Sequence, residues 1–266
     1  MSENTFRQTF AVSGPARLSL RNIRGKMTVR PADDGQVTVT AVKYLDDGDP
    51  DRTSVEMWQS GEGHVFVATR YQREWPGRPC RVDYDVRLPA PCTLALRGVT
   101  GGVLLHGLDG TFRVKMVSGS VRLQELDGSL WVSSVSGDVT AVQLGGRIHV
   151  DTVSGNVQVQ AARLDVIEAS TVNGDLTMET SLAGGPYRFE TVSGDLRLVV
   201  PPETNCRVEM QSVSGRLAMN GLTRKAGPLT GRQEATLGEG GTLVRFHTIS
   251  GDCTVGRPVT AGAGAS

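Results

Sequence analysis

The chain has 266 residues, of which 38% are apolar and 5% aromatic, and its 28 Lys and Arg residues balance 28 Asp and Glu residues. This balance gives no overall field to attract nucleic acid or an anionic membrane. The scarcity of aromatic side chains favours thin, layered β-structure over a broad globular interior. No run of apolar residues approaches the length of a transmembrane helix.

The N-terminal stretch "MSENTFRQTFAVSGPARLSL" has no basic segment leading into an apolar one, which predicts a cytoplasmic chain without a signal peptide. Association with the cell envelope is the other expectation for its location. Within residues 1–97, "QVTVTAVKY", "HVFVATRYQ" and "CRVDYDVRLP" alternate as strands, and "RNIRGKMTV" reads as a corner followed by a strand. We expect this region to combine early coils with hairpins that cap one end, because an uncovered end would expose unpaired backbone.

Residues 98–256 contain a repeat. Glycines recur every nine residues from Gly101 to Gly155, and the second and fourth positions after each are apolar, as in a short strand with one inward face. Val-Ser-Gly or a variant recurs at intervals of 18 to 21 residues and then once after 36. Its glycines are the predicted structural corners, where a tight bend needs a residue without a Cβ: Gly119, Gly137, Gly155, Gly174, Gly194, Gly215 and Gly251.

Two nine-residue arcs make one coil, which predicts an all-β fold: a parallel β-helix, or solenoid, with coils of about 18 to 21 residues and right-handed winding. The 36-residue interval is interpreted as two coils, one without its signature. The valine of each Val-Ser-Gly is predicted to point inward, so Val135→Asp should be strongly destabilising and Ser133→Asp should not. The Ser or Thr before these valines, with Met116 before Val117 as the exception, should form a column that can hydrogen-bond across coils. Residues 257–266 are expected to be a disordered tail.

The search for reactive groups predicts no enzyme, no catalytic residue and no cofactor. Cys80, Cys92, Cys206 and Cys253 are expected to be ordinary thiols, and the histidines share no metal-ligand spacing. Asp175 and Asp195 follow successive corner glycines and are weak metal candidates, although Asp in that position commonly hydrogen-bonds the local backbone.

Trp131 points outward by register and is a candidate surface contact.

The segments "VRLPAPCTLALRGVTGGVLLHGLDG", "TVSGDL" and "GEGGTLVRFHTISGDCTV" resemble the bacterial "putative adhesin" family, a domain of unknown function with β-helical structure. The resemblance covers about residues 15 to 256 and implies the fold. Together with the repeat, it favours a non-enzymatic scaffold or interaction module, monomeric or weakly oligomeric, whose partner is an unknown protein or a cell-surface polymer. A bactofilin-like filament is one alternative, and a carbohydrate-binding or polysaccharide lyase-type β-helix is another.

Overall fold

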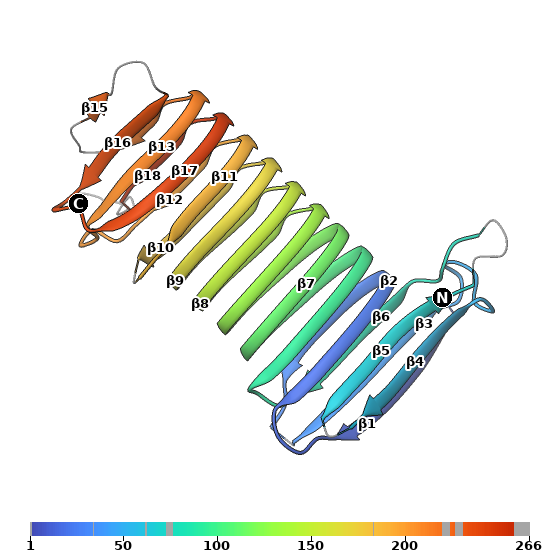
Figure 1. Cartoon of the computed structure of the whole chain (residues 1–266). Coiled ribbons are helices and arrows are strands. Elements are labelled where there is room, and N and C mark those ends of the chain that lie inside the picture. The colour runs from blue at the N-terminus through green and yellow to red at the C-terminus, as the bar shows by residue number, and fades with distance from the viewer. Residues whose placement is uncertain are drawn as a thin grey trace, which may run out of the picture.

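The protein is described by a computed structural model covering residues 2–33, 35–61, 63–72, 77–182, 184–219, 224–226 and 231–257. Strands and short connections make up this part of the chain, and they stack as a solenoid-like rod (Figure 1). None of its segments is a helix long and apolar enough to cross a membrane. Residues 258–266, which include nearly all of the predicted disordered tail, lie outside the described residues.

The strands of the first third are β1 (Glu3–Ala11), β2 (Ala16–Pro31), β3 (Gln36–Tyr44), β4 (Thr53–Ser60), β5 (His64–Tyr71) and β6 (Val82–Leu88). The middle holds β7 (Cys92–Ser136), β8 (Val139–Ser154), β9 (Val157–Asn173), β10 (Leu176–Leu182), β11 (Tyr187–Ser193) and β12 (Leu196–Val199). The last third holds β13 (Cys206–Ser214), β14 (Leu217–Met219), β15 (Arg224–Ala226), β16 (Arg232–Leu237), β17 (Thr242–Ser250) and β18 (Cys253–Gly256).

The central coils stack in chain order with the predicted interval. Val121 of β7 pairs in parallel with Val139 of β8, and Val139 pairs with Val157 of β9, each 18 residues further along. β7 runs through several corners without a break, because the extended backbone continues around each bend. Each of these coils therefore has neighbours on both edges, which satisfies the backbone hydrogen bonds of a parallel sheet.

At the C-terminal end the order of coils departs from the order of the sequence. β17 pairs in parallel with β11 on one side and β13 on the other, and β18 lies likewise between β12 and β14. The coil formed by β17 and β18, the last of the described chain, therefore lies in the stack between the coil of β11 and β12 and the coil of β13 and β14. The prediction that one copy of the repeat lies unseen in the 36-residue interval is wrong: that stretch contains β16, which pairs antiparallel with β13 and covers the outermost coil.

The N-terminal end has the same feature. β2 lies between the coil formed by β5 and β6 and the first coil of β7, in parallel with all three. β4 pairs antiparallel with β5, and β3 pairs antiparallel with both β6 and β1. Both outermost parallel coils are thus covered by antiparallel strands, as Figure 1 shows at the two ends of the rod.

The interior of the rod is one continuous column of aliphatic side chains with few aromatic ones, as the composition predicts. The predicted position of the signature valines is wrong, however. They are exposed by 40% to 83% and form a column on the outside of the rod: Val117, Val135, Val153, Val172, Val192 and Val213, with Val99 before them and Ile249 in the last coil. The cause is the pleat, because inward and outward positions alternate without interruption from Val132, which is buried, to Val135.

The residues that precede these valines point inward instead. Ser134, Thr152, Thr171, Thr191, Ser212 and Thr248 are buried, and in the described structure their hydroxyl oxygens have no hydrogen-bond partner. The expectation that this column would hydrogen-bond across coils is therefore not met. Its members contribute a methyl or methylene group to the packing, while an unpaired buried hydroxyl reduces stability.

The corner glycines stack directly on one another. A Cβ atom on Gly137, where φ is 130°, would lie 2.3 Å from the carbonyl oxygen of Gly119 in the preceding coil. The same contact recurs up the column to Gly251 and Gly215, where the Cβ positions lie 1.9 Å from carbonyl oxygens of Gly194 and Gly251. Glycine is required at these corners because the neighbouring backbone occupies the place of a side chain.

Candidate functional site

The residue after each corner glycine builds a hydrogen-bonded ladder along the rod. Asp138 accepts the backbone N–H of Asn156 at 2.9 Å, and Asn156 accepts that of Asp175 at 2.9 Å. The series continues through Asp195 and Asp252 to the N–H of Arg216, with donor-to-acceptor distances of 2.8 to 2.9 Å. Each side-chain oxygen therefore satisfies an amide in the next coil that the parallel sheet leaves unpaired at the bend.

Asp175 and Asp195 are neighbours in this ladder. The Oδ1 atom of Asp175 accepts the N–H of Asp195, and the Oδ1 atom of Asp195 accepts the N–H of Asp252. The described residues contain no group of three or more side chains suited to hold a metal ion. Both carboxylates thus have a structural role, although the amide that each accepts lies in the next coil and not in the local backbone that the sequence-based alternative named.

The ladder is interrupted near the N-terminal end. At the same position in successive coils stand Asp83, Lys26, Gly102 and Ser120, followed by Asp138. Asp83 accepts the N–H of Lys26 at 2.8 Å, but Lys26, Gly102 and Ser120 carry neither a carboxylate nor a carboxamide. The interruption therefore spans three coils.

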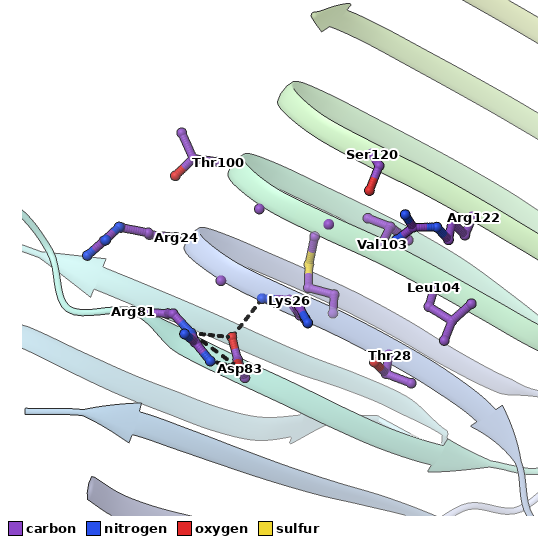
Figure 2. Close-up of a pocket in the computed structure, with 14 residues that line it drawn as sticks. Arg24, Lys26, Thr28, Arg81, Asp83, Thr100, Val103, Leu104, Ser120 and Arg122 are labelled. Carbon is purple, nitrogen blue, oxygen red and sulfur yellow. Dashed lines mark hydrogen bonds and ion pairs between the residues drawn. The ribbon is translucent and has the colours of Figure 1, made fainter. Parts of the chain in front are cut away.

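A groove of about 520 Å³ lies at this interruption; we call it the corner groove (Figure 2). Four basic residues line it, Arg24, Lys26, Arg81 and Arg122, with Asp83 as its single carboxylate. Thr28, Thr100 and Ser120 add hydroxyl groups and Leu104 adds apolar surface, whereas the side chains of Met27 and Val103 belong to the buried core beneath. The volume lies in the range of ordinary small-ligand sites.

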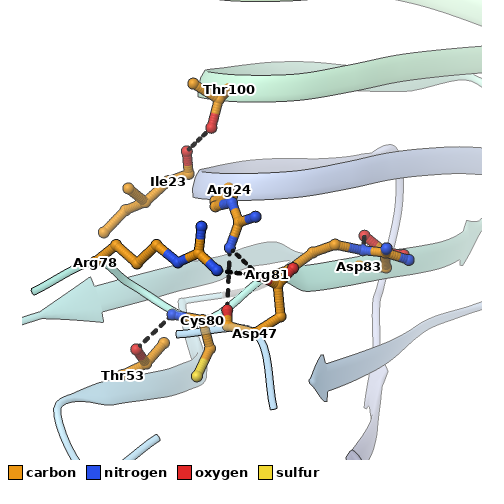
Figure 3. Close-up of polar contacts among 9 residues, drawn as sticks. All are labelled: Ile23, Arg24, Asp47, Thr53, Arg78, Cys80, Arg81, Asp83 and Thr100. Carbon is orange, nitrogen blue, oxygen red and sulfur yellow. Dashed lines mark hydrogen bonds and ion pairs between the residues drawn. The ribbon is translucent and has the colours of Figure 1, made fainter. Parts of the chain in front are cut away.

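Two of the basic residues are held by carboxylates of the N-terminal region (Figure 3). Arg24 contacts the Oδ1 atom of Asp47 at 2.8 Å, and Arg78 contacts the same atom at 3.1 Å. The hydrogen bond from Arg24 is the main cause that lowers the pKa of Asp47 below its usual value. Arg81 contacts Asp83 at 2.7 Å, and this hydrogen bond raises the pKa of the arginine. These ion pairs fix Arg24 and Arg81 at the edge of the groove.

The other two basic side chains are not held in this way. Among the described residues, no carboxylate lies within ion-pair distance of the Lys26 ammonium or the Arg122 guanidinium. Counting Arg78, five cations therefore surround two carboxylates, and the groove has an excess of positive charge. In a chain of balanced overall charge, such a local excess favours an anionic ligand.

Other polar groups form surface contacts outside the groove. His149 bonds Asp151 through Nε2 at 2.7 Å and Glu168 through Nδ1 at 3.0 Å, so the two carboxylates lie on opposite sides of the ring and do not converge on one point. Trp131 is 40% exposed, as its register predicts, and the Arg113 guanidinium lies 5.8 Å from the centre of its ring.

The four cysteines are free and buried. Burial raises the pKa of Cys92 and Cys253 to about 12 and that of Cys206 to about 11, which makes these thiols poor nucleophiles.

The sequence model of the Toastrack family, DUF4097, matches residues 110–182 and 148–256, which together are more than half of the chain. The chain belongs to the Toastrack family. This confirms the family predicted from its sequence motifs. No curated protein matches the sequence.

Solved structures resemble this Toastrack protein over nearly its whole length. A putative adhesin from Bacteroides fragilis is 12% identical with a TM-score of 0.51, and the alignment covers 96% of this chain and 97% of that one. A putative adhesin from Parabacteroides distasonis is 10% identical with a TM-score of 0.38 over 96% and 97% of the two chains. At 12% identity the first likeness supports the fold alone.

The corner groove is absent from the sequence-based predictions for this Toastrack protein. Lys26 and Arg81 belong to the irregular N-terminal region, and the sequence does not show that β2 and β6 stack beneath β7. One signal was present: the position after the corner glycine is Asp or Asn from Asp138 to Asp195, but glycine at Gly102.

Proposed function

We propose that the chain is a non-enzymatic interaction module: a β-helical rod that binds an anionic cell-surface polymer through the corner groove and acts at the cell envelope. The observation that carries the proposal is the pair of unmatched cations, Lys26 and Arg122, in a groove where the carboxylate ladder is interrupted. The description of a similarly folded protein as an adhesin supports a role in surface interaction. The right-handed winding remains a prediction.

The contacts of the described residues favour binding over catalysis. The buried thiols have raised pKa values, and the repeated hydroxyls are either buried in the column or spread along the rod. Nucleophilic catalysis requires a nucleophile within hydrogen-bond reach of a base, and neither the thiols nor the repeated hydroxyls have one. Outside these groups, Ser19 lies 3.0 Å from Nε2 of His64, but no carboxylate of the described residues orients that histidine. The antiparallel strands over both outermost coils also disfavour the end-to-end stacking of a filament.

The test is sedimentation of the purified chain with isolated bacterial envelopes, paired with an assay for cleavage of polygalacturonate. We expect saturable binding that weakens with added salt and no unsaturated product. A Lys26→Gln, Arg122→Gln variant should bind more weakly. Arg197→Gln is the matched control, because Arg197 occupies the same position as Arg122 in a distant coil. Absence of binding, or turnover of the polymer, would contradict the proposal.

A further inference from the structure

The backbone does not require glycine at position 102. A Cβ atom there would meet the carbonyl oxygen of Ser120 at 3.5 Å and its hydroxyl at 3.6 Å, which are ordinary contacts. At the neighbouring Gly101, by contrast, φ is 137° and a Cβ atom would lie 2.0 Å from the carbonyl oxygen of Gly25. The two adjacent glycines therefore differ in kind: Gly101 makes the corner, and Gly102 keeps the groove open.

The repeat shows what a side chain at this position would do. Asp138 accepts the N–H of Asn156 in the next coil at 2.9 Å, and an aspartate at 102 would accept the N–H of Ser120 in the same way. With glycine, no side chain of residue 102 occupies that place, whose nearest atoms are the carbonyl and hydroxyl oxygens of Ser120. An oxygen supplied by a ligand can take the position that the protein's own carboxylate occupies in later coils.

The surrounding charges suit a carboxylate at this point. Lys26 and Arg122 stand on the coils to either side of Gly102, and neither is paired with an acidic residue of the described chain. Arg122 offers the planar fork that matches a carboxylate, and Lys26 adds a point charge. Arg24 and Arg81 are held by Asp47 and Asp83, which largely balance their charges, so Lys26 and Arg122 carry the positive excess that faces a ligand.

The rest of the lining favours a sugar acid over an acidic peptide. The coils at the groove are paired on both edges, so a peptide has no free strand edge to extend. The hydroxyls of Thr28 and Ser120 can instead exchange hydrogen bonds with the hydroxyls of a sugar, and that of Thr100, which donates to the carbonyl of Ile23 at 3.3 Å, can accept one. The groove is partly open to solvent on the outside of the rod, so a polymer can lie across it.

We propose that the corner groove binds a uronate: its carboxylate accepts the N–H of Ser120 in the place left open by Gly102 and faces Lys26 and Arg122. This assignment rests on the proposed function and names the ligand of the same site. No covalent step is involved.

The test is calorimetric titration of the full chain with trigalacturonate. The wild-type chain should bind trigalacturonate. Its affinity for the neutral methyl ester of trigalacturonate should be lower by about tenfold or more, because the negative charge is lost. Gly102→Asp fills the site with the ladder's own carboxylate and should weaken binding about tenfold to a hundredfold, the range for losing a charge-assisted hydrogen bond. Asn156→Asp adds the same charge three coils along the ladder and should change affinity less than about twofold.

Thermal unfolding of both variants establishes that they are folded, since the space beside Gly102 admits a side chain. The assignment is overturned by absence of wild-type binding, by unchanged affinity in Gly102→Asp, or by equal affinity for the methyl ester. Tighter binding of triaspartate than of trigalacturonate would overturn the choice of a sugar acid, and equal affinity for citrate would overturn the need for a sugar. If the chain sediments with envelopes but does not bind trigalacturonate in these titrations, the proposed interaction module is supported and the proposed uronate site is overturned.

Discussion

Replacing Gly137 by alanine tests the stacking of the corners. The new Cβ would lie 2.3 Å from the carbonyl oxygen of Gly119, whereas ordinary contacts begin at 3.4 Å, so the two coils would have to separate by roughly 1 Å at this bend. Such overpacking costs about 1–3 kcal/mol. The φ of 130° adds about 1–3 kcal/mol for a residue with a side chain. After a gain of about 0.4–1 kcal/mol from the less flexible unfolded chain, the net loss is about 1–5.5 kcal/mol.

The assay is thermal unfolding followed by circular dichroism, with urea unfolding as a second measure. For a chain of this size we expect the midpoint to fall by roughly 2–20 °C. Gly102→Ala is the matched control, because its Cβ meets only ordinary contacts, and its midpoint should stay within about 2 °C of the wild type. Equal midpoints for the two variants would refute the argument that the backbone of the preceding coil excludes a side chain at the corner.

Three further outcomes follow from the corrected register and the surface contacts. Val132→Asp should destabilise the fold by several kcal/mol in urea unfolding while Val135→Asp changes it little, because Val132 is 1% exposed and Val135 50%. A larger loss of stability in Val135→Asp than in Val132→Asp would mean that Val135 points inward after all. Thr171→Val should raise stability by about 1 kcal/mol, since the buried hydroxyl has no partner, and a loss of stability would reveal a hydrogen bond at that oxygen. For His149, burial lowers the pKa, but hydrogen bonds and charges from its two carboxylate partners raise it overall. The stabilising contribution of protonated His149 is therefore present below the unfolded pKa and is lost as the pH rises through the folded pKa. We therefore expect His149→Gln to lower the melting midpoint more at about pH 6 than at about pH 9.

The sequence predicts the coil because its glycine and apolar positions repeat with constant spacing. The Val121–Val139–Val157 register could be read directly from these intervals. The direction of Val135 could not, because at a corner both an inward and an outward valine agree with a hydrophobic signature. The continuous alternation from Val132 decides the matter, and the burial of Ser134 shows that the hydroxyl occupies the inner place.

The candidate site depends on contacts that the repeat does not encode. Lys26 meets Gly102 because β2 is inserted beneath β7, and Asp47 reaches Arg24 from a turn outside the coils. Such placements follow from how the irregular ends fold back on the rod, for which the sequence has no periodic signal. The sequence does contain Gly102 at a position that is Asp or Asn in most later coils. This difference can be recognised as important only once the hydrogen bonds of the ladder are known.

The inserted position of β17 has a consequence for how the rod is made. During synthesis β13 emerges before β17, yet in the finished molecule β17 separates β13 from β11. At about 5–20 residues per second, the ribosome needs seconds to deliver the strand that belongs between them. Until then β11, which already pairs with β9, has no permanent neighbour on its other edge, so β13 either stays unpaired or pairs in a position that it must later leave. This end can therefore reach its final arrangement only after β17 has been synthesised, whereas the middle coils can assemble one after another as they leave the ribosome.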